Sequence, residues 1–256
     1  MRAVTSLLLL LSGGMAAAPA PSRSVVSVVA PMTYGRQCWS TVELRNLGIR
    51  AVAVTVEGHK ESGALVGLEG TESTVVKLAP RQRLSLKLRD AEGDEAMGWV
   101  RVLEELAGGW DRPVVAVSGK TECLAGEQLR TMAQTVSYPM RNPEVERLVE
   151  EMPGRVVLLL NSGGEAATVD ICYSRGSWTV VDDQRRMICT ATSYVQLPPF
   201  GLATAPISRE GSTEIVVKGT GGELVIRAMR LEAEKTRVYS VDSSIQFGSV
   251  DRVRKR

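Results

Sequence analysis

The sequence predicts an all-β protein made of two tandem antiparallel β-sandwich domains, joined by a short, helical, proline-rich linker. Apolar residues alternate with polar ones through most of the chain, and Gly, Pro, Asn and Asp interrupt this alternation at intervals of roughly 8–12 residues. The alternation is lost once, over residues 138–154, and then resumes. We therefore expect sandwich domains over residues 24–137 and 155–249, on either side of the linker.

The first half contains several short strand patterns. In residues 83–89, Leu84, Leu86 and Leu88 alternate with polar and charged residues, as expected of a strand with one buried face. Further strands are expected over residues 38–45, 51–57, 74–78, 97–103 and 113–118. Short strands separated by turns favour antiparallel sheets over parallel βαβ units.

Residues 138–154 are rich in proline and charged residues. Asn142 can cap a helix, Pro143 can occupy its first turn, and Pro153 with Gly154 can end it. We therefore expect a short helix in a linker that packs against a neighbouring domain.

The second half repeats the short alternating strand patterns of the first half. Strands are expected over residues 155–160, 166–173, 177–181, 187–197, 213–218, 223–229 and 237–242. Residues 43–57 and 159–172 share a strand, an Asn/Gly turn and a second strand, and a Leu-x-Pro segment ends at Pro80 in one half and at Pro199 in the other. We interpret the halves as two diverged copies of one β-domain.

This order of strand, Asn-x-Gly turn, alternating strand and Leu-x-Pro segment resembles the immunoglobulin-like and fibronectin-type-III-like sandwich repeats of secreted bacterial proteins. The resemblance covers most of residues 24–249 and implies a tandem Ig-like architecture. The antibody-type core Trp between two sheet-bridging cysteines is not clearly present, because Trp39 merely adjoins Cys38. The architecture by itself implies no single function.

Both ends of the chain differ in composition from the sandwich segments. Residues 1–18 contain a basic residue, an apolar run and then small residues, the three parts of a secretory signal peptide. The apolar run is far shorter than the roughly 20 residues of a membrane span. We expect an exported protein, periplasmic or extracellular, without a transmembrane segment, and a solvated basic tail over residues 250–256.

Four cysteines in an exported chain predict disulfides, with three possible pairings. Cys38 shares a strand face with Val42, and Cys123 shares a face with Val117, so both point toward one core. We therefore favour a Cys38–Cys123 bridge.

The second pair is Cys172 and Cys189, which would close a local loop. Cys172 alternates out of phase with the apolar Ile171, so two buried free thiols remain an alternative. No two cysteines have the spacing of a zinc knuckle, and we expect no metal site.

Composition argues against most enzyme classes and against nucleic acid. The chain has one histidine, an aromatic content of 4% and a net charge of +2, so we expect neither a cofactor nor a nucleic-acid partner. His59 is expected in an exposed polar turn, although Glu57 or Glu61 could orient it as a general base. Residues 118–121 resemble the end of a phosphate-binding loop, but Val114 replaces a required glycine, and Gly119 is expected in a turn.

The candidate binding residues lie in two loops, Trp110 and Asp111 in one and Arg175 and Trp178 in the other. Trp99 is expected in a core instead. The leading hypothesis is an exported, non-enzymatic protein with a binding, adhesive or structural role in the cell envelope, whose partner is an envelope protein or a polysaccharide.

Two alternatives remain. An exported hydrolase, or an accessory domain of one, would bring carboxylates together in space. A periplasmic assembly chaperone would pair a strand with its partner's sheet and so requires an open strand edge.

Overall fold

Every regular element that the structure describes is a β-strand. The computed structural model describes residues 23–68, 73–88, 96–106, 112–125, 127–148, 155–181, 184–209, 211–234 and 236–240. All strand pairs in these ranges are antiparallel. The predicted all-β class is confirmed, whereas residues 1–18 and 250–256 lie outside the described residues. Within those ranges, no helix has the length and apolar character needed to cross a membrane.

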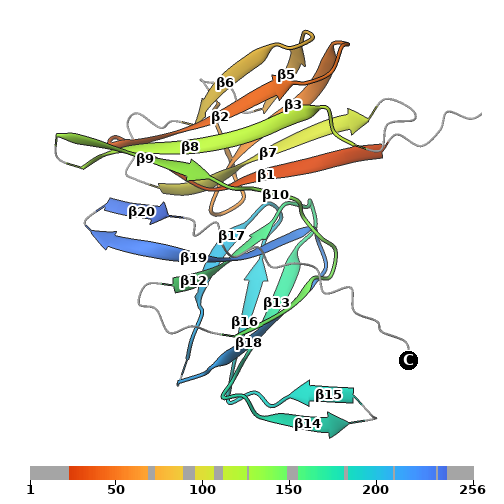
Figure 1. Ribbon diagram of the computed structural model, residues 1–256, viewed down its shortest axis with the longest axis vertical. Helices are drawn as coiled ribbons and strands as arrows, with labels where there is room; N and C mark the ends of the chain where they lie inside the picture. Colours follow the sequence, from red (N-terminus) through yellow and green to blue (C-terminus); the bar gives the residue numbers. More distant parts are fainter. Residues whose placement is uncertain are drawn as a thin grey trace, which may run out of the picture.

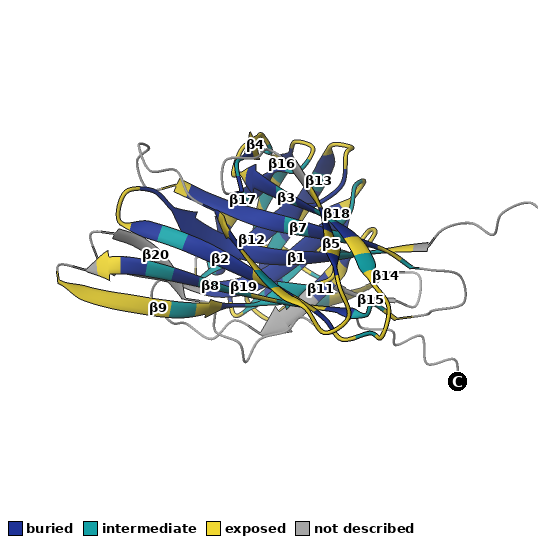
Figure 2. Ribbon diagram, turned by 90° about the horizontal axis from the view of Figure 1, so that it is seen from above, coloured by how far each residue is buried: buried dark blue, intermediate teal, exposed yellow. Residues whose placement is uncertain are grey.

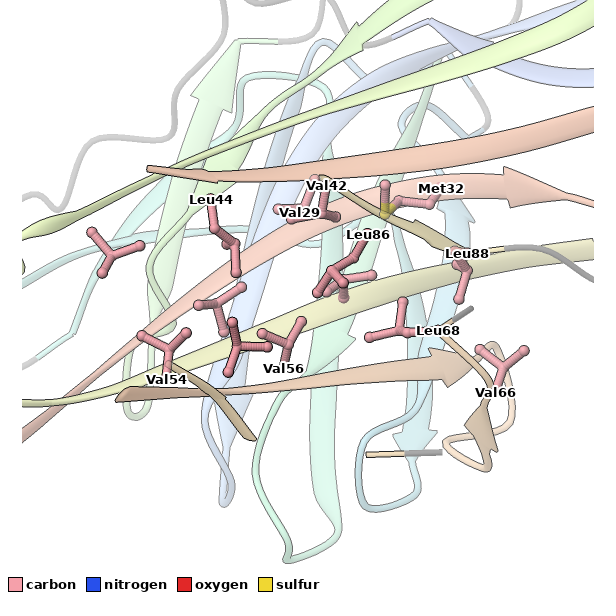
Figure 3. Close-up of a cluster of buried hydrophobic side chains, with 14 of the residues drawn as sticks. Val29, Met32, Val42, Leu44, Val54, Val56, Val66, Leu68, Leu86 and Leu88 are labelled. Carbon is pink, nitrogen blue, oxygen red and sulfur yellow. The ribbon is translucent and has the colours of Figure 1, made fainter. Parts of the chain in front are cut away.

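Two sheets form the first half of the molecule. Sheet A contains β1 (Arg23–Tyr34), β3 (Val52–Lys60), β4 (Leu65–Val66), β5 (Ser73–Leu78), β7 (Ala96–Leu106) and β10 (Val136–Ser137). Sheet B contains β2 (Cys38–Asn46), β6 (Arg83–Leu88), β8 (Val115–Ala125) and β9 (Gln128–Gln134). Between them, Val54 and Val56 of sheet A face Val42, Leu44 and Leu86 of sheet B, forming the AB core (Figure 3).

Two further sheets form the second half. Sheet C contains β12 (Arg155–Asn161), β17 (Leu202–Pro206), β19 (Leu224–Glu234) and β20 (Thr236–Ser240). Sheet D contains β11 (Glu144–Leu148), β13 (Ala167–Ser174), β16 (Ala191–Leu197) and β18 (Glu214–Thr220). Val157, Ile171, Val217 and Ile226 are among the residues of the CD core between them. A separate hairpin of β14 (Trp178–Val181) and β15 (Gln184–Met187) projects from this half (Figure 1).

A third apolar core joins the two halves. Sheets A and C pack against each other through the faces that point away from the AB and CD cores, which stacks the sheets in the order B, A, C, D (Figure 1). We call this contact the AC core. Its fully or nearly fully buried members are Val28, Ala30, Met97 and Trp99 of sheet A and Leu158, Leu160, Leu202, Val225 and Met229 of sheet C.

Strands in the middle of this stack are buried on both faces. In β12, Val157 and Leu159 point into the CD core, and Leu158 and Leu160 point into the AC core. This explains the unbroken apolar run over residues 156–160, because a strand covered on both sides needs no polar face. In Figure 2, β1, β7 and β12 are mostly buried, while the edge strand β9 is largely exposed.

The predicted linker helix is wrong where the structure describes it. Residues 144–148 form β11, an edge strand of sheet D that pairs with β18 from Glu144 opposite Lys218 to Leu148 opposite Glu214. Val145 is 4% exposed and belongs to the CD core, so strand pairing and burial override the helix-like capping pattern. Residues 149–154 lie outside the described residues.

An asparagine organises the equivalent turn in each half. The Asn46 Nδ2 donates to the carbonyls of Arg50, Leu78 and Ala79, and its Oδ1 accepts from Gly48 N. The fully buried Asn161 has the same role.

In the second half, Asn161 Nδ2 donates to the carbonyls of Glu165 and Pro198, and its Oδ1 accepts from Gly163 N. Each asparagine thus ties an Asn-x-Gly turn to the segment that precedes the next proline turn. The two segments that resemble each other in sequence therefore make the same side-chain contacts.

These asparagines should be major determinants of stability. We expect Asn46→Ala or Asn161→Ala to lower the free energy of unfolding by at least about 2 kcal/mol, because buried carbonyls lose their donors. Arg45→Ala, at an exposed position beside Asn46, should change it by less than about 0.5 kcal/mol. Urea denaturation of the three variants measures this, and equal effects of Asn46→Ala and Arg45→Ala would contradict it.

Candidate functional site

The structure describes one of the two predicted binding loops. Trp110 and Asp111 lie outside the described residues, so their predicted role stays a prediction. Arg175 is exposed at the bend after β13, and Trp178, which is partly buried, begins β14 opposite Met187. Arg175 and Trp178 therefore lie together at the base of the projecting hairpin.

A disulfide fixes this hairpin to the outer surface of sheet D. Cys172 and Cys189 form a bridge, and the backbone N–H of Ile188 donates to the carbonyl of Ser177 across the hairpin base, at 2.9 Å. Cys172 lies out of phase with the buried Ile171 because it points away from the CD core. Val180, 70% exposed, lies farther along the hairpin.

The other predicted disulfide also forms, but inside one sheet. Cys38 of β2 and Cys123 of β8 are directly opposite each other in sheet B, and both are buried beside Met132. The bridge expected from the strand parity of the two cysteines is therefore confirmed. Gly119, predicted in a turn, lies within β8, where a Cβ would collide with the Val29 side chain of the facing sheet.

The single histidine lies in the interface between the halves. The prediction of an exposed turn is wrong, because His59 belongs to β3, points to the outer face of sheet A and is 2% exposed. Its imidazole is stacked between Trp99 of β7, at 4.5 Å between ring centroids, and Phe200 of the second half, at 4.8 Å. The predicted burial of Trp99 is confirmed, with full burial in the AC core.

Polar contacts complete the surroundings of the imidazole. The His59 Nδ1 is 3.2 Å from the carbonyl oxygen of Gly63, and its Nε2 is 3.6 Å from the Glu57 carboxylate. Arg101 donates to the same Glu57 carboxylate at 3.1 Å. Burial lowers the pKa of His59, more strongly than the Gly63 carbonyl and Glu57 raise it. The imidazole is therefore neutral near pH 7.

Phe200 reaches His59 from a strained turn of the second half. It has a positive φ of 57° directly after Pro199, and Gly201 N closes the turn on the Pro198 carbonyl at 3.0 Å. The Trp99 Nε1 donates to the Phe200 carbonyl at 3.0 Å. Phe200, in its left-handed conformation, is thus held by this hydrogen bond and by the stacking of its ring on His59. In the first half, Arg81 has the same conformation after Pro80, with a φ of 64°, but its side chain is exposed.

Backbone contacts hold the same two segments together. The Leu202 N–H donates to the Glu61 carbonyl at 2.9 Å, which joins the β3–β4 hairpin to the second half. Gly63 has a φ of 88°, and a Cβ there would collide with the Pro199 carbonyl. We call His59, Trp99, Phe200, Glu57 and Arg101 the histidine clasp.

The clasp contains a histidine and a carboxylate, as a catalytic acid–base pair does, but its imidazole is as inaccessible to solvent as a core side chain. Both faces of the imidazole are covered by rings, and its side chain is 3% exposed, so this arrangement offers no path for a substrate to the ring nitrogens. In the part of the chain that the structure describes, no group of three His, Cys, Asp or Glu side chains could hold a metal ion. We interpret the clasp as a device that fixes the halves to each other.

A polar cleft of about 420 Å³ opens beside the clasp. Arg101 of the clasp lines it together with Arg141, Glu165 and Glu223, and Arg141 lies 3.9 Å from the Glu223 carboxylate. The charges in the cleft are therefore balanced and give no preference for an anionic or a cationic ligand. No family model, curated protein or solved structure matches the chain.

The buried histidine should make stability depend on pH. Since its folded pKa lies below the ordinary value of 6.5, the unfolded chain binds a proton that the folded chain rejects between these two values. The free energy of unfolding should therefore decrease as the pH falls from about 7.5 to about 5.5. Urea denaturation across this range measures the effect.

His59→Phe provides the matched control, because phenylalanine can stack between the same rings and does not titrate. The chain has no second histidine, so the variant should show a nearly flat profile over this range. Wild-type stability that rises toward pH 5.5 would instead mean that the attraction between Glu57 and the protonated imidazole outweighs its burial.

Proposed function

We propose that this is an exported, non-enzymatic binding protein of the cell envelope, with an adhesive or structural role. In this proposal its two halves are diverged copies of an Ig-like sandwich domain. Two disulfides are typical of an oxidising, exported environment, and the matching turns of Asn46 and Asn161 support the duplication. The partner is an envelope protein or a polysaccharide.

The observation that carries the proposal is the projecting hairpin of β14 and β15. It stands away from the stacked sheets and is anchored by the Cys172–Cys189 bridge. A covalent anchor reduces the conformational entropy that an exposed loop loses when it binds. Val180 and Ile188, 70% and 44% exposed, supply apolar contact area, and Trp178 and Arg175 lie at the base.

A chaperone-like role is the second candidate. In the described part of the chain, β9 pairs only with β8 and β16 pairs only with β13. Each therefore offers an edge with unpaired backbone groups, as strand addition by a partner requires. This role would depend on backbone pairing at an edge and not on the side chains of the hairpin.

Capture from envelope extracts and polysaccharides separates the two candidates. We expect Val180→Asp to abolish capture of the partner, because a carboxylate would replace an apolar contact at the hairpin. Val75→Asp, an equally exposed valine of β5 in the first half, should leave capture unchanged. Strand addition would be favoured if capture survives Val180→Asp but is lost when a proline replaces Ser193 in β16. A purely structural role would be favoured if no partner is captured at all.

A further inference from the structure

A buried arginine lies at the margin of the AC core. Arg227 is 6% exposed and lies on β19 between Val225 and Met229, which both belong to that core. Its register partner in β12 is the buried Leu158. Arg227 therefore points from sheet C toward the first half, on the apolar side of the sheet.

Among the described residues, the side-chain partner of the guanidinium is a neutral hydroxyl. The Arg227 Nη1 donates to the Ser137 hydroxyl of β10 at 3.0 Å. Among the residues that the structure describes, no carboxylate forms an ion pair with it. A guanidinium remains charged inside a protein, and an uncompensated buried charge is strongly destabilising. Burial accordingly lowers the pKa of Arg227.

A cavity of about 270 Å³ adjoins this arginine. Its lining is Val136, Ser137, Tyr138, Met140, Val225, Ile226 and Arg227. Two backbone hydrogen bonds of 2.8 Å between Met140 and Leu224 fasten one wall to β19, so the cavity is built from paired backbone. Its polar side chains are one guanidinium, one hydroxyl and one phenol, and the remaining side chains are apolar.

We propose that this cavity binds a carboxylate that carries a short apolar substituent. The planar guanidinium can hold a carboxylate through two parallel N–H donors, with the Ser137 hydroxyl beside them. Val136, Met140 and Val225 surround the substituent. A single guanidinium balances one negative charge, so a monocarboxylate fits better than a phosphate dianion. The site is separate from the β14–β15 hairpin and does not depend on the function proposed for it.

Calorimetric titration with isovalerate at pH 7 and low salt tests this directly. We expect saturable binding of isovalerate and none of isovaleramide, which has the same shape without the charge. N-acetylvaline distinguishes the source of the carboxylate, because its binding would indicate the end of a polypeptide and its exclusion a free small acid. Inorganic phosphate should bind at least about tenfold more weakly than isovalerate.

Matched variants locate the binding to the cavity. Arg227→Gln should weaken isovalerate binding by at least about tenfold, whereas Arg45→Gln removes the same charge from an exposed site and should have no effect. Ser137→Ala keeps the guanidinium and should weaken binding by a few fold, which keeps the test decisive if Arg227→Gln fails to fold. Any one of three results would overturn the proposal: no saturable binding of isovalerate, equal binding of isovaleramide, or unchanged affinity in both single variants, Ser137→Ala and Arg227→Gln.

Discussion

The packing of sheet A against sheet C is the interaction on which the rest of the structure depends. Each sheet has one face in its own sandwich core and a second apolar face that would be exposed if the halves were separate. Burying both second faces in the AC core removes an apolar patch of a kind that soluble monomers seldom expose. Three apolar cores therefore hold the stack of four sheets together, and the two halves do not move independently of each other.

The histidine clasp depends on this packing and reinforces it. The sandwich of the first half positions His59 and Trp99, but the ring that covers the other face of the imidazole comes from Phe200 in the second half. The positive φ of Phe200 is tolerated because stacking and the Trp99 hydrogen bond hold the residue in place. Arg81 has the same left-handed conformation after Pro80 in the first half, but its side chain is exposed, so this turn conformation occurs in both halves and Phe200 alone uses it to reach the clasp.

The strands with one polar and one buried face are the ones that the sequence predicts well. The alternation of Leu84, Leu86 and Leu88 predicts β6, and the parity of Cys38 and Cys123 predicts their bridge. No strand was predicted at β1, because both of its faces are buried and consecutive valines hide the period of two. A helix was predicted at β11 because Asn142 and Pro143 satisfy helix-start rules, while the long-range pairing with β18 decides the outcome.

The site was less predictable than the fold. His59 and Phe200 are far apart in the sequence, and nothing local to either indicates that their rings stack. The sequence held a partial indication that His59 lies within a strand. Thr55, Glu57 and His59 share the face of β3 opposite the buried Val54 and Val56. The apolar run around Leu158 was a second signal, since it indicates a strand covered on both sides and therefore a layer beyond a simple sandwich.

Native-state hydrogen exchange of Leu158→Ala tests the role of the AC core most directly. Leu158 is 1% exposed in that core and belongs to neither sandwich core, so its truncation should lower the free energy of unfolding by about 2–5 kcal/mol. If the AC core couples the halves, amides of β2 in sheet B and β13 in sheet D should lose protection by the same amount. Loss of protection in β13 alone, with β2 unchanged, would show that the halves unfold independently and would contradict the account.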